Sequence, residues 1–241
     1  MRRTLSLIVL ILCGACGRTL SHSYLFVWTG DAAQEASDFL AVIDADPGSP
    51  RYASVIASVP TGATGTQPHH TEQEMPPNGP LLANGFHAGR TWLFDLTQPS
   101  NPRILASFGD IAGYSHPHTF GRLPNGHVLA TFQYLAGAGA MLHPAGHGSE
   151  QVTEHSIGGL VEMDERGHPF RSGSANDSQI EDKRIYPYSV VALPEFDRAI
   201  STTTDMDHAD TTQTSQWVQI WRLSDLKLLR SIAVQPGPRG V

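Results

Sequence analysis

One pattern recurs four times along this chain of 241 residues: an apolar strand, a polar stop, a turn and a returning apolar strand. The stops fall at Asp44, Asp95, Asp164 and Ser224, at intervals of 51, 69 and 60 residues. Propeller blades repeat every ~40–50 residues, and insertions lengthen that spacing. The repeat therefore predicts a series of antiparallel sheets.

The remaining segments agree with an all-β fold. The predicted strand at residues 126–132 begins at the second residue of the pair Asn125-Gly126, which is typical of a tight hairpin. No segment keeps an apolar period of 3.6 residues over three turns. The 23 glycines and 17 prolines favour many short elements joined by turns. We predict an all-β protein, with a partial β-propeller domain over residues 21–241.

Three polar stretches lie between the predicted strands. Residues 62–82 and 136–156 are expected to be long loops, and residues 172–183 are expected to be exposed. After the strand at 228–234 the chain ends in a turn-like segment, so we expect an incomplete arc of about four blades. Open sheet edges tend to pair with other chains, so self-association is a further expectation.

The charge balance excludes one class of partner. There are 16 lysines and arginines against 23 aspartates and glutamates, a formal net charge of −7, with no basic cluster. We therefore expect no nucleic-acid binding. The chain also lacks a Gly-x-Ser-x-Gly nucleophile motif, a phosphate-binding glycine loop and a His-Glu-x-x-His motif.

Residues 1–17 resemble an export signal. Arg2 and Arg3 precede an apolar run that is too short to span a bilayer, and small residues follow it. Cys16 after Gly-Ala resembles a lipoprotein cleavage site, although Cys13 stands where an aliphatic residue is usual. We expect an exported protein, periplasmic or lipid-anchored at Cys16 in the cell envelope. The alternative is a buried N-terminal strand.

Two histidine pairs point to metal chemistry. His69 and His70 lie in the predicted loop 62–82, where both rings can turn toward one ion. His116 and His118 enter a strand, where an i, i+2 pair shares a face about 6.5–7 Å apart. Four imidazoles without a thiolate suit copper or zinc, and the affinity order favours copper. The alternative is that each histidine caps a turn or fills a polar edge.

Two further side chains are weaker candidates. His208 lies among aspartates just past a predicted strand, and is either a fifth ligand or part of a solvated turn. Glu72 follows the first histidine pair, and is either a proton acceptor or a solvated loop carboxylate.

Several segments resemble the selenium-binding protein family, which includes the bacterial periplasmic methanethiol oxidases. The resemblance runs over most of residues 24–240, and its most specific motifs are PHHTE at 68–72 and SHPHTF at 115–120. It implies a seven-bladed propeller with histidine-bound copper in the central channel. It also implies that methanethiol, O2 and water are converted to formaldehyde, hydrogen sulfide and hydrogen peroxide.

Carried over by motif, the family's ligand pairs fall on the two histidine pairs of this chain. Two features depart from the family pattern. The chain corresponds only to the N-terminal half of its relatives, and Ser215 and Gln216 stand where many relatives carry a histidine. Both cysteines lie in the predicted signal, so selenium attachment to a mature cysteine is not expected.

Three functions remain open at this point. The first is a copper-dependent oxidase acting on a small thiol with O2. The second is a non-catalytic propeller of the cell envelope that binds a metal or a partner. The third is a truncated, inactive family member.

Overall fold

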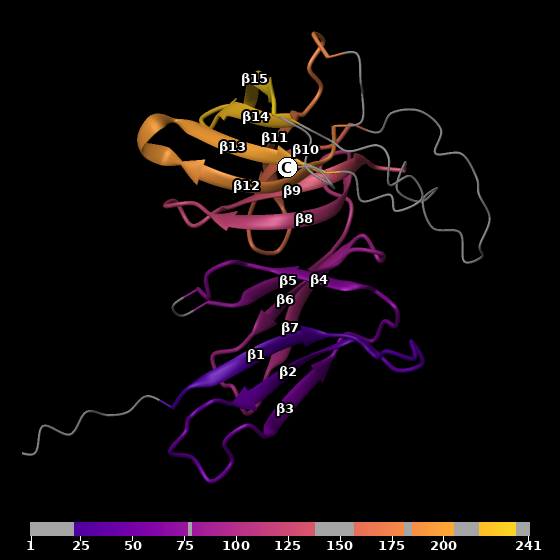
Figure 1. The fold of residues 1–241 in the computed structure, drawn as a ribbon, viewed down its shortest axis with the longest axis vertical. Helices are drawn as coiled ribbons and strands as arrows, with labels where there is room; N and C mark the ends of the chain where they lie inside the picture. The colour runs from indigo at the N-terminus through magenta and orange to yellow at the C-terminus, as the bar shows by residue number, and fades with distance from the viewer. Residues whose placement is uncertain (1–21, 77–78, 138–156, 181–184, 205–216, 235–241) are drawn as a thin grey trace, which may run out of the picture.

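A computed structural model describes residues 22–76, 79–137, 157–180, 185–204 and 217–234. In these ranges the protein forms fifteen strands and one short 3-10 helix, arranged as four antiparallel sheets (Figure 1). No helix in these ranges has the length and apolar character needed to cross a membrane. The all-β prediction is confirmed. The predicted signal segment and His208 lie outside the described residues.

Strands that are consecutive in the sequence are neighbours in each sheet. The first sheet contains β1 (Tyr24–Thr29), β2 (Phe39–Asp44) and β3 (Val55–Pro60). The second contains β4 (Pro68–Thr71), β5 (Leu81–Gly85), β6 (Arg90–Asp95) and β7 (Arg103–Phe108). The third contains β8 (Tyr114–Arg122), β9 (Val128–Leu135), β10 (Gly159–Met163) and β11 (Pro169–Ser174). The fourth contains β12 (Pro187–Leu193), β13 (Arg198–Thr203), β14 (Trp217–Arg222) and β15 (Lys227–Ala233), with the helix η2 (Pro194–Phe196) before β13.

Each sheet packs face to face on the next, so the four form successive blades (Figure 1). Side chains alternate between the two neighbouring sheets: Trp92 and Phe94 of β6 pack toward the first sheet, whereas Leu93 packs toward the third. Leu129 of β9 likewise packs toward the fourth sheet. Because both faces are buried, the middle strands read as continuous apolar runs.

The polar stops of the sequence repeat hold the turns before the outermost strands. Asp95 accepts hydrogen bonds from the backbone N–H and hydroxyl of Thr97, at 3.1 and 2.6 Å. Asp164 accepts the N–H groups of Arg166 and His168, at 2.8 and 2.9 Å. Asp44 takes the same position after β2 and accepts the N–H of Asp46 at 3.1 Å. These carboxylates are structural turn caps.

The turn caps also align the four sheets with one another. β2, β6, β10 and β14 all precede this turn, so β1 corresponds to β5, the second strand of its sheet. Among the described residues, the first sheet therefore has no counterpart of β4, β8 and β12. These three strands begin their sheets, and β8 lies in contact with both β4 and β12.

The sequence prediction was wrong about the stretch 62–82. It contains all of β4, which carries the first histidine pair, and the start of β5. The low apolar content hid β4, because a strand at the end of its sheet needs few core side chains. Residues 172–174 form the end of β11, and most of the described residues of 172–180 are exposed, as expected, although Ala175 and Ile180 are buried. Most of the predicted loop 136–156 lies outside the described residues.

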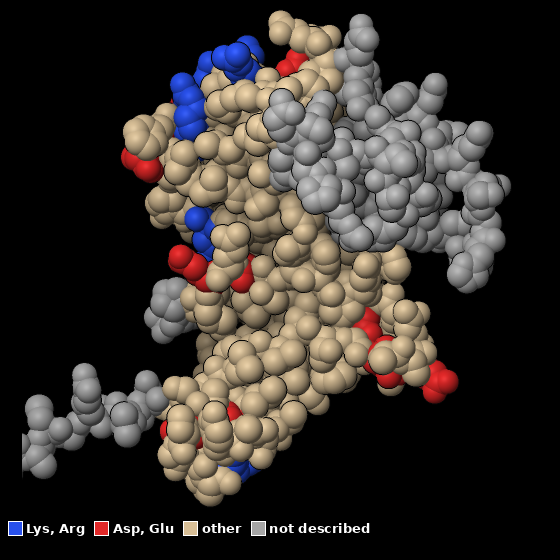
Figure 2. All heavy atoms as spheres, in the orientation of Figure 1, with Lys and Arg blue, Asp and Glu red and all other residues tan. Residues whose placement is uncertain are grey.

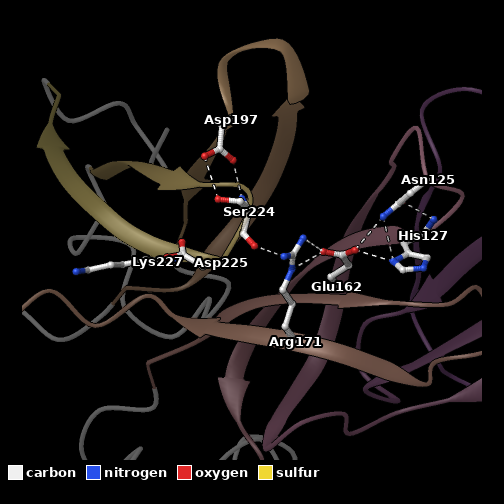
Figure 3. A network of polar contacts seen from close by, with 8 residues as sticks. All are labelled: Asn125, His127, Glu162, Arg171, Asp197, Ser224, Asp225 and Lys227. Atoms are coloured by element: carbon white, nitrogen blue, oxygen red, sulfur yellow. Dashed lines mark hydrogen bonds and ion pairs between the residues drawn. The ribbon is translucent and has the colours of Figure 1, made fainter.

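A polar network connects the third and fourth sheets (Figure 3). The buried Glu162 accepts hydrogen bonds from Arg171 Nε at 2.6 Å and Asn125 Nδ2 at 3.3 Å, and its carboxylate lies 2.6 Å from His127 Nδ1. Arg171 also donates to the backbone carbonyl of Ser224, in the turn before β15. On the face drawn in Figure 2, several Lys and Arg side chains lie near one another at the top of the view. The other charged side chains are scattered among uncharged ones.

Candidate metal centre

Three histidines from two sheets meet in one cluster. His69 and His70 come from β4 and His118 from β8. One ring nitrogen of each lies within 4.8 Å of the others, and the Nε2 atoms of His69 and His118 are 2.9 Å apart. The ring centroids are 4.3 to 4.8 Å apart. His118 is fully buried, whereas the two histidines of β4 are partly exposed.

The same local geometry brings each histidine into the cluster. The β4–β5 register shifts between Pro68 and Thr71, which leaves His69 and His70 outside the regular ladder. The β8–β9 register shifts in the same way between Pro117 and Phe120. Bulges of this kind redirect side chains and are common at the edges of sheets. A proline supplies no backbone donor, which suits the entry to an irregular segment.

The orientation of His118 is fixed by a backbone carbonyl from the fourth sheet. His118 Nδ1 lies 2.8 Å from the carbonyl oxygen of Tyr188 in β12. A carbonyl can only accept, so Nδ1 carries the proton and Nε2 presents its lone pair to the cluster. Metal-binding histidines are commonly held in this way, since the hydrogen bond selects the tautomer and orients the ring.

Burial favours the neutral form of two imidazoles of the cluster, those of His70 and His118. It lowers the pKa of His70, and it holds the pKa of His118 well below its usual range, with a further contribution from the charges of the two neighbouring histidines. The hydrogen bond to the Tyr188 carbonyl opposes this shift only in part. Neutral imidazole is the form that binds a metal, so the cluster is suited to a cation.

The buried Asn84 is a site residue that the sequence analysis missed. Its Oδ1 accepts the backbone N–H of His70 at 2.7 Å, and its Nδ2 donates to the carbonyl of Pro117 at 2.8 Å. It thereby joins β4 to β8 beside the cluster. The isolated Asn-Gly pair at the end of β5 resembles a turn signal, so no pattern in the sequence singled it out.

His116 does not join this cluster. It is buried, but its ring lies 5.5 Å from that of Phe86 and 5.1 Å from that of Tyr134. The expectation of a shared face assumed a regular strand. Instead, His116 has a left-handed backbone with φ of 57°, and the register shift follows immediately, so strand alternation is lost. Three of the four predicted ligands therefore converge among the described residues.

Glu72 is neither solvated nor directed at the histidines. It is buried, its Oε1 accepts a hydrogen bond from Arg122 Nε at 2.7 Å, and its Oε2 accepts the backbone N–H of Leu82 at 2.9 Å. Arg122 also bonds Glu165 at 3.1 Å. These contacts make Glu72 a structural ion-pair partner between the second and third sheets.

A pocket of about 330 Å³ lies beside the centre along the strands. Its lining includes Glu72, Phe120 and Val190. Each lies two residues after a residue at the cluster: His70, His118 and Tyr188, respectively. A two-residue step along a strand is about 6.5–7 Å. Met75 and Pro76 add to its apolar lining, whereas the three histidines of the cluster are not among the residues that line it.

The donor set fits a borderline or soft transition metal. Three imidazoles without a carboxylate or thiolate suit copper or zinc and do not suit Mg²⁺ or Ca²⁺, which prefer oxygen ligands. Three protein ligands also leave a coordination position for a substrate, which is typical of catalytic rather than structural sites. The histidine cluster thus supports a metal centre, while its geometry alone does not distinguish between the two metals.

Comparison with known proteins agrees with the fold and with the family resemblance. No protein-family model matches the chain. A segment of 111 residues is 35% identical to a methanethiol oxidase from Hyphomicrobium sp, and it covers 44% of this chain and 25% of that protein. A selenium-binding protein from Sulfolobus tokodaii has a similar structure, with a TM-score of 0.62 and 17% identity over 88% of this chain. The resemblance to the selenium-binding protein family is confirmed.

The chain spans only part of these relatives. It covers 48% of the Sulfolobus protein, and the match to the oxidase covers a quarter of that enzyme. A europium-containing methanol dehydrogenase also shares the fold, with a TM-score of 0.51, 10% identity and coverage of 88% of this chain and 40% of that one. The four sheets are thus a propeller-like arc, as the sequence repeat predicted.

Proposed function

We propose that this protein provides part of the copper centre of a methanethiol oxidase. The observation that carries the proposal is the convergence of His69, His70 and His118, together with the partial identity to a methanethiol oxidase. The reaction would convert methanethiol, O2 and water to formaldehyde, hydrogen sulfide and hydrogen peroxide. We further propose that the protein is exported and acts in the periplasm or on the envelope.

Copper, when bound, would supply the electron transfer between the thiol and O2, which no side chain of the centre can carry out. The three histidines would hold it through neutral ring nitrogens. The Tyr188 carbonyl would keep the Nδ1 proton on His118, so that Nε2 stays directed at the ion. Burial would exclude water from one side of the centre.

The pocket beside the centre supports a small apolar substrate. Its apolar wall of Met75, Pro76 and Phe120 suits a methyl group. Among the described residues that line it, the one cation is Arg122, which is already bonded to two carboxylates, while Glu74 adds a further negative charge. An anionic substrate would therefore be disfavoured, whereas methanethiol approaches as a neutral molecule.

Oxygen uptake tests the proposal. We expect copper-loaded protein to consume O2 with methanethiol and to release hydrogen peroxide, and His118→Ala to lose this activity. His168→Ala is a matched control, because this histidine is exposed and its ring bonds the turn carboxylate Asp164. Copper-loaded wild-type protein that consumes O2 no faster than His118→Ala would contradict the proposed reaction.

A further inference from the structure

The three strands at the cluster repeat one local feature. In β4, β8 and β12 a proline is followed by two residues outside the ladder, and pairing resumes three residues after the proline. The prolines are Pro68, Pro117 and Pro187. Each proline pairs with one residue of the next strand. The residue three positions after the proline pairs with the residue that lies two positions before that partner in the sequence. The three bulges are therefore structurally equivalent.

The residue immediately after the proline is the same kind of position in each sheet. It is His69 in the second sheet, His118 in the third and Tyr188 in the fourth. The first two are members of the histidine cluster. In the fourth sheet, Tyr188 therefore occupies the position at which the second and third sheets each carry a candidate metal-binding histidine.

The contacts of Tyr188 agree with its place in the repeat. Its hydroxyl lies 3.2 Å from His70 Nε2, and its ring lies 4.1 Å from the ring of His118. Its carbonyl oxygen accepts from His118 Nδ1 at 2.8 Å, Thr119 Oγ1 at 2.8 Å and Thr131 Oγ1 at 2.9 Å. Because the bulge removes Tyr188 from the β12–β13 ladder, this carbonyl is available for the histidine.

The two threonines hold the carbonyl in place. Thr131 is fully buried in β9, and its hydroxyl both donates to the Tyr188 carbonyl and accepts the backbone N–H of Thr119 at 3.0 Å. The third and fourth sheets are thereby fixed relative to each other at the histidine cluster.

We infer that Tyr188 is the fourth residue of the metal centre, acting as a positioning residue for two histidines. Its carbonyl, held by Thr119 and Thr131, orients His118, and its hydroxyl orients His70. This inference rests on the proposed metal site, but it does not depend on which substrate the copper oxidises.

Copper titration of three variants tests the inference. Tyr188→Phe removes only the hydroxyl, and Thr131→Val removes one bond to the carbonyl without changing the size of the side chain. We expect each to weaken Cu²⁺ binding about 10-fold or more, as measured by competition with a chelator. We also expect each to change the electron paramagnetic resonance spectrum of the bound ion. Thr131→Ser should restore wild-type affinity, because the hydroxyl is regained.

The controls separate this inference from the proposed function. Tyr52→Phe changes an exposed tyrosine and should leave both affinity and spectrum unchanged. If wild-type protein binds no copper, the metal site itself is wrong. If wild-type protein binds copper and folded Tyr188→Phe and Thr131→Val give the same affinity and spectrum, the role of Tyr188 is refuted while the metal site stands.

Discussion

Two buried polar clusters of this protein differ in how their charges are balanced. The network around Glu162 joins a carboxylate to Arg171, His127 and Asn125, so its donors and acceptors satisfy one another (Figure 3). The histidine centre joins three bases, and the groups bonded to their rings include the hydroxyls of Tyr188 and Thr119 and the Tyr188 carbonyl. Both clusters lie between sheets, and both contain histidine.

This difference separates a structural cluster from a binding site. A balanced ion pair gains nothing from a further cation, because its acceptor is already occupied. Three imidazoles held together offer nitrogen lone pairs, and a metal ion supplies the positive charge that these lone pairs can bind. Histidine content alone does not reveal this distinction; the partner of each ring does.

The largest expected effect is on copper affinity. We expect His118→Ala to lower Cu²⁺ affinity at least about 100-fold, because a buried ligand and the orientation given by the Tyr188 carbonyl are lost together. Glu162→Gln should leave affinity within about twofold, since no metal ligand changes. Isothermal titration of both variants, with circular dichroism to confirm folding, measures the contrast. Equal losses in the two variants would remove the distinction between the clusters.

His116→Ala divides the second histidine pair. We expect it to change copper affinity less than about threefold, because its ring packs against Phe86 and Tyr134 rather than facing the cluster. The same titration measures it. A loss as large as that of His118→Ala would show that His116 moves into the centre when the metal binds.

The pH dependence of stability should separate the clusters next. The pKa values of His70 and His118 lie below the ordinary 6.5, so the unfolded chain binds more protons as the pH falls below that value. Stability without metal should therefore fall below pH 6.5, by at most about 1.4 kcal/mol per pH unit for His118 and by less for the partly exposed His70, where solvent screens the shift. The pKa of Glu162 is also lowered, from 4.5, so its contribution is present above pH 4.5 and is lost only at lower pH.

Urea unfolding between pH 7 and 4 measures these two ranges. His118→Gln should flatten the dependence that begins near pH 6.5, whereas Glu162→Gln should leave that part unchanged. A wild-type stability that stays constant from pH 7 to 5 would mean that the cluster accommodates protons without cost.

The fold could be predicted from the sequence further than the centre could. The polar stops and the apolar runs on either side of them are local signals, and they located the strands before and after the turns at Asp44, Asp95, Asp164 and Ser224. The cluster depends on features that no local pattern reported. The left-handed backbone of His116 is unusual for a residue with a side chain, so a regular strand was the natural expectation. Because of this backbone conformation, His116 lies beside Phe86 and Tyr134 instead of in the histidine cluster.

The role of Tyr188 was hidden for a different reason. The sequence search looked for histidines, whereas the repeated unit is a proline followed by a residue that leaves the ladder. Pro68, Pro117 and Pro187 are visible in the sequence, but their equivalence appears only when the three strands are aligned by their pairing. Asn84 was missed similarly, because its two hydrogen bonds join strands that are far apart in the chain.

Glu162→Gln should lower stability without affecting the metal. The substitution removes the charge that pairs with Arg171 and lies against His127. Breaking a fully buried ion pair costs about 3–5 kcal/mol. The Arg171 side chain is 37% exposed, so solvent reduces the loss here to about 1–2 kcal/mol. Urea unfolding at pH 7 measures it. An unchanged stability would mean that the network contributes nothing to holding the third and fourth sheets together.

The smallest effect is expected at an exposed ion pair at the edge of the network drawn in Figure 3. Arg222 Nη1 and Asp225 Oδ2 are 3.0 Å apart, with side chains 42% and 47% exposed. Asp225 also accepts the backbone N–H of Lys227 at 3.1 Å, a bond that asparagine can retain. Asp225→Asn should therefore leave the free energy of unfolding unchanged within the error of the titration, because water screens the pair. A loss as large as that of Glu162→Gln in the same urea titration would show that exposed turn carboxylates matter as much as the buried network, and burial would no longer explain the comparison.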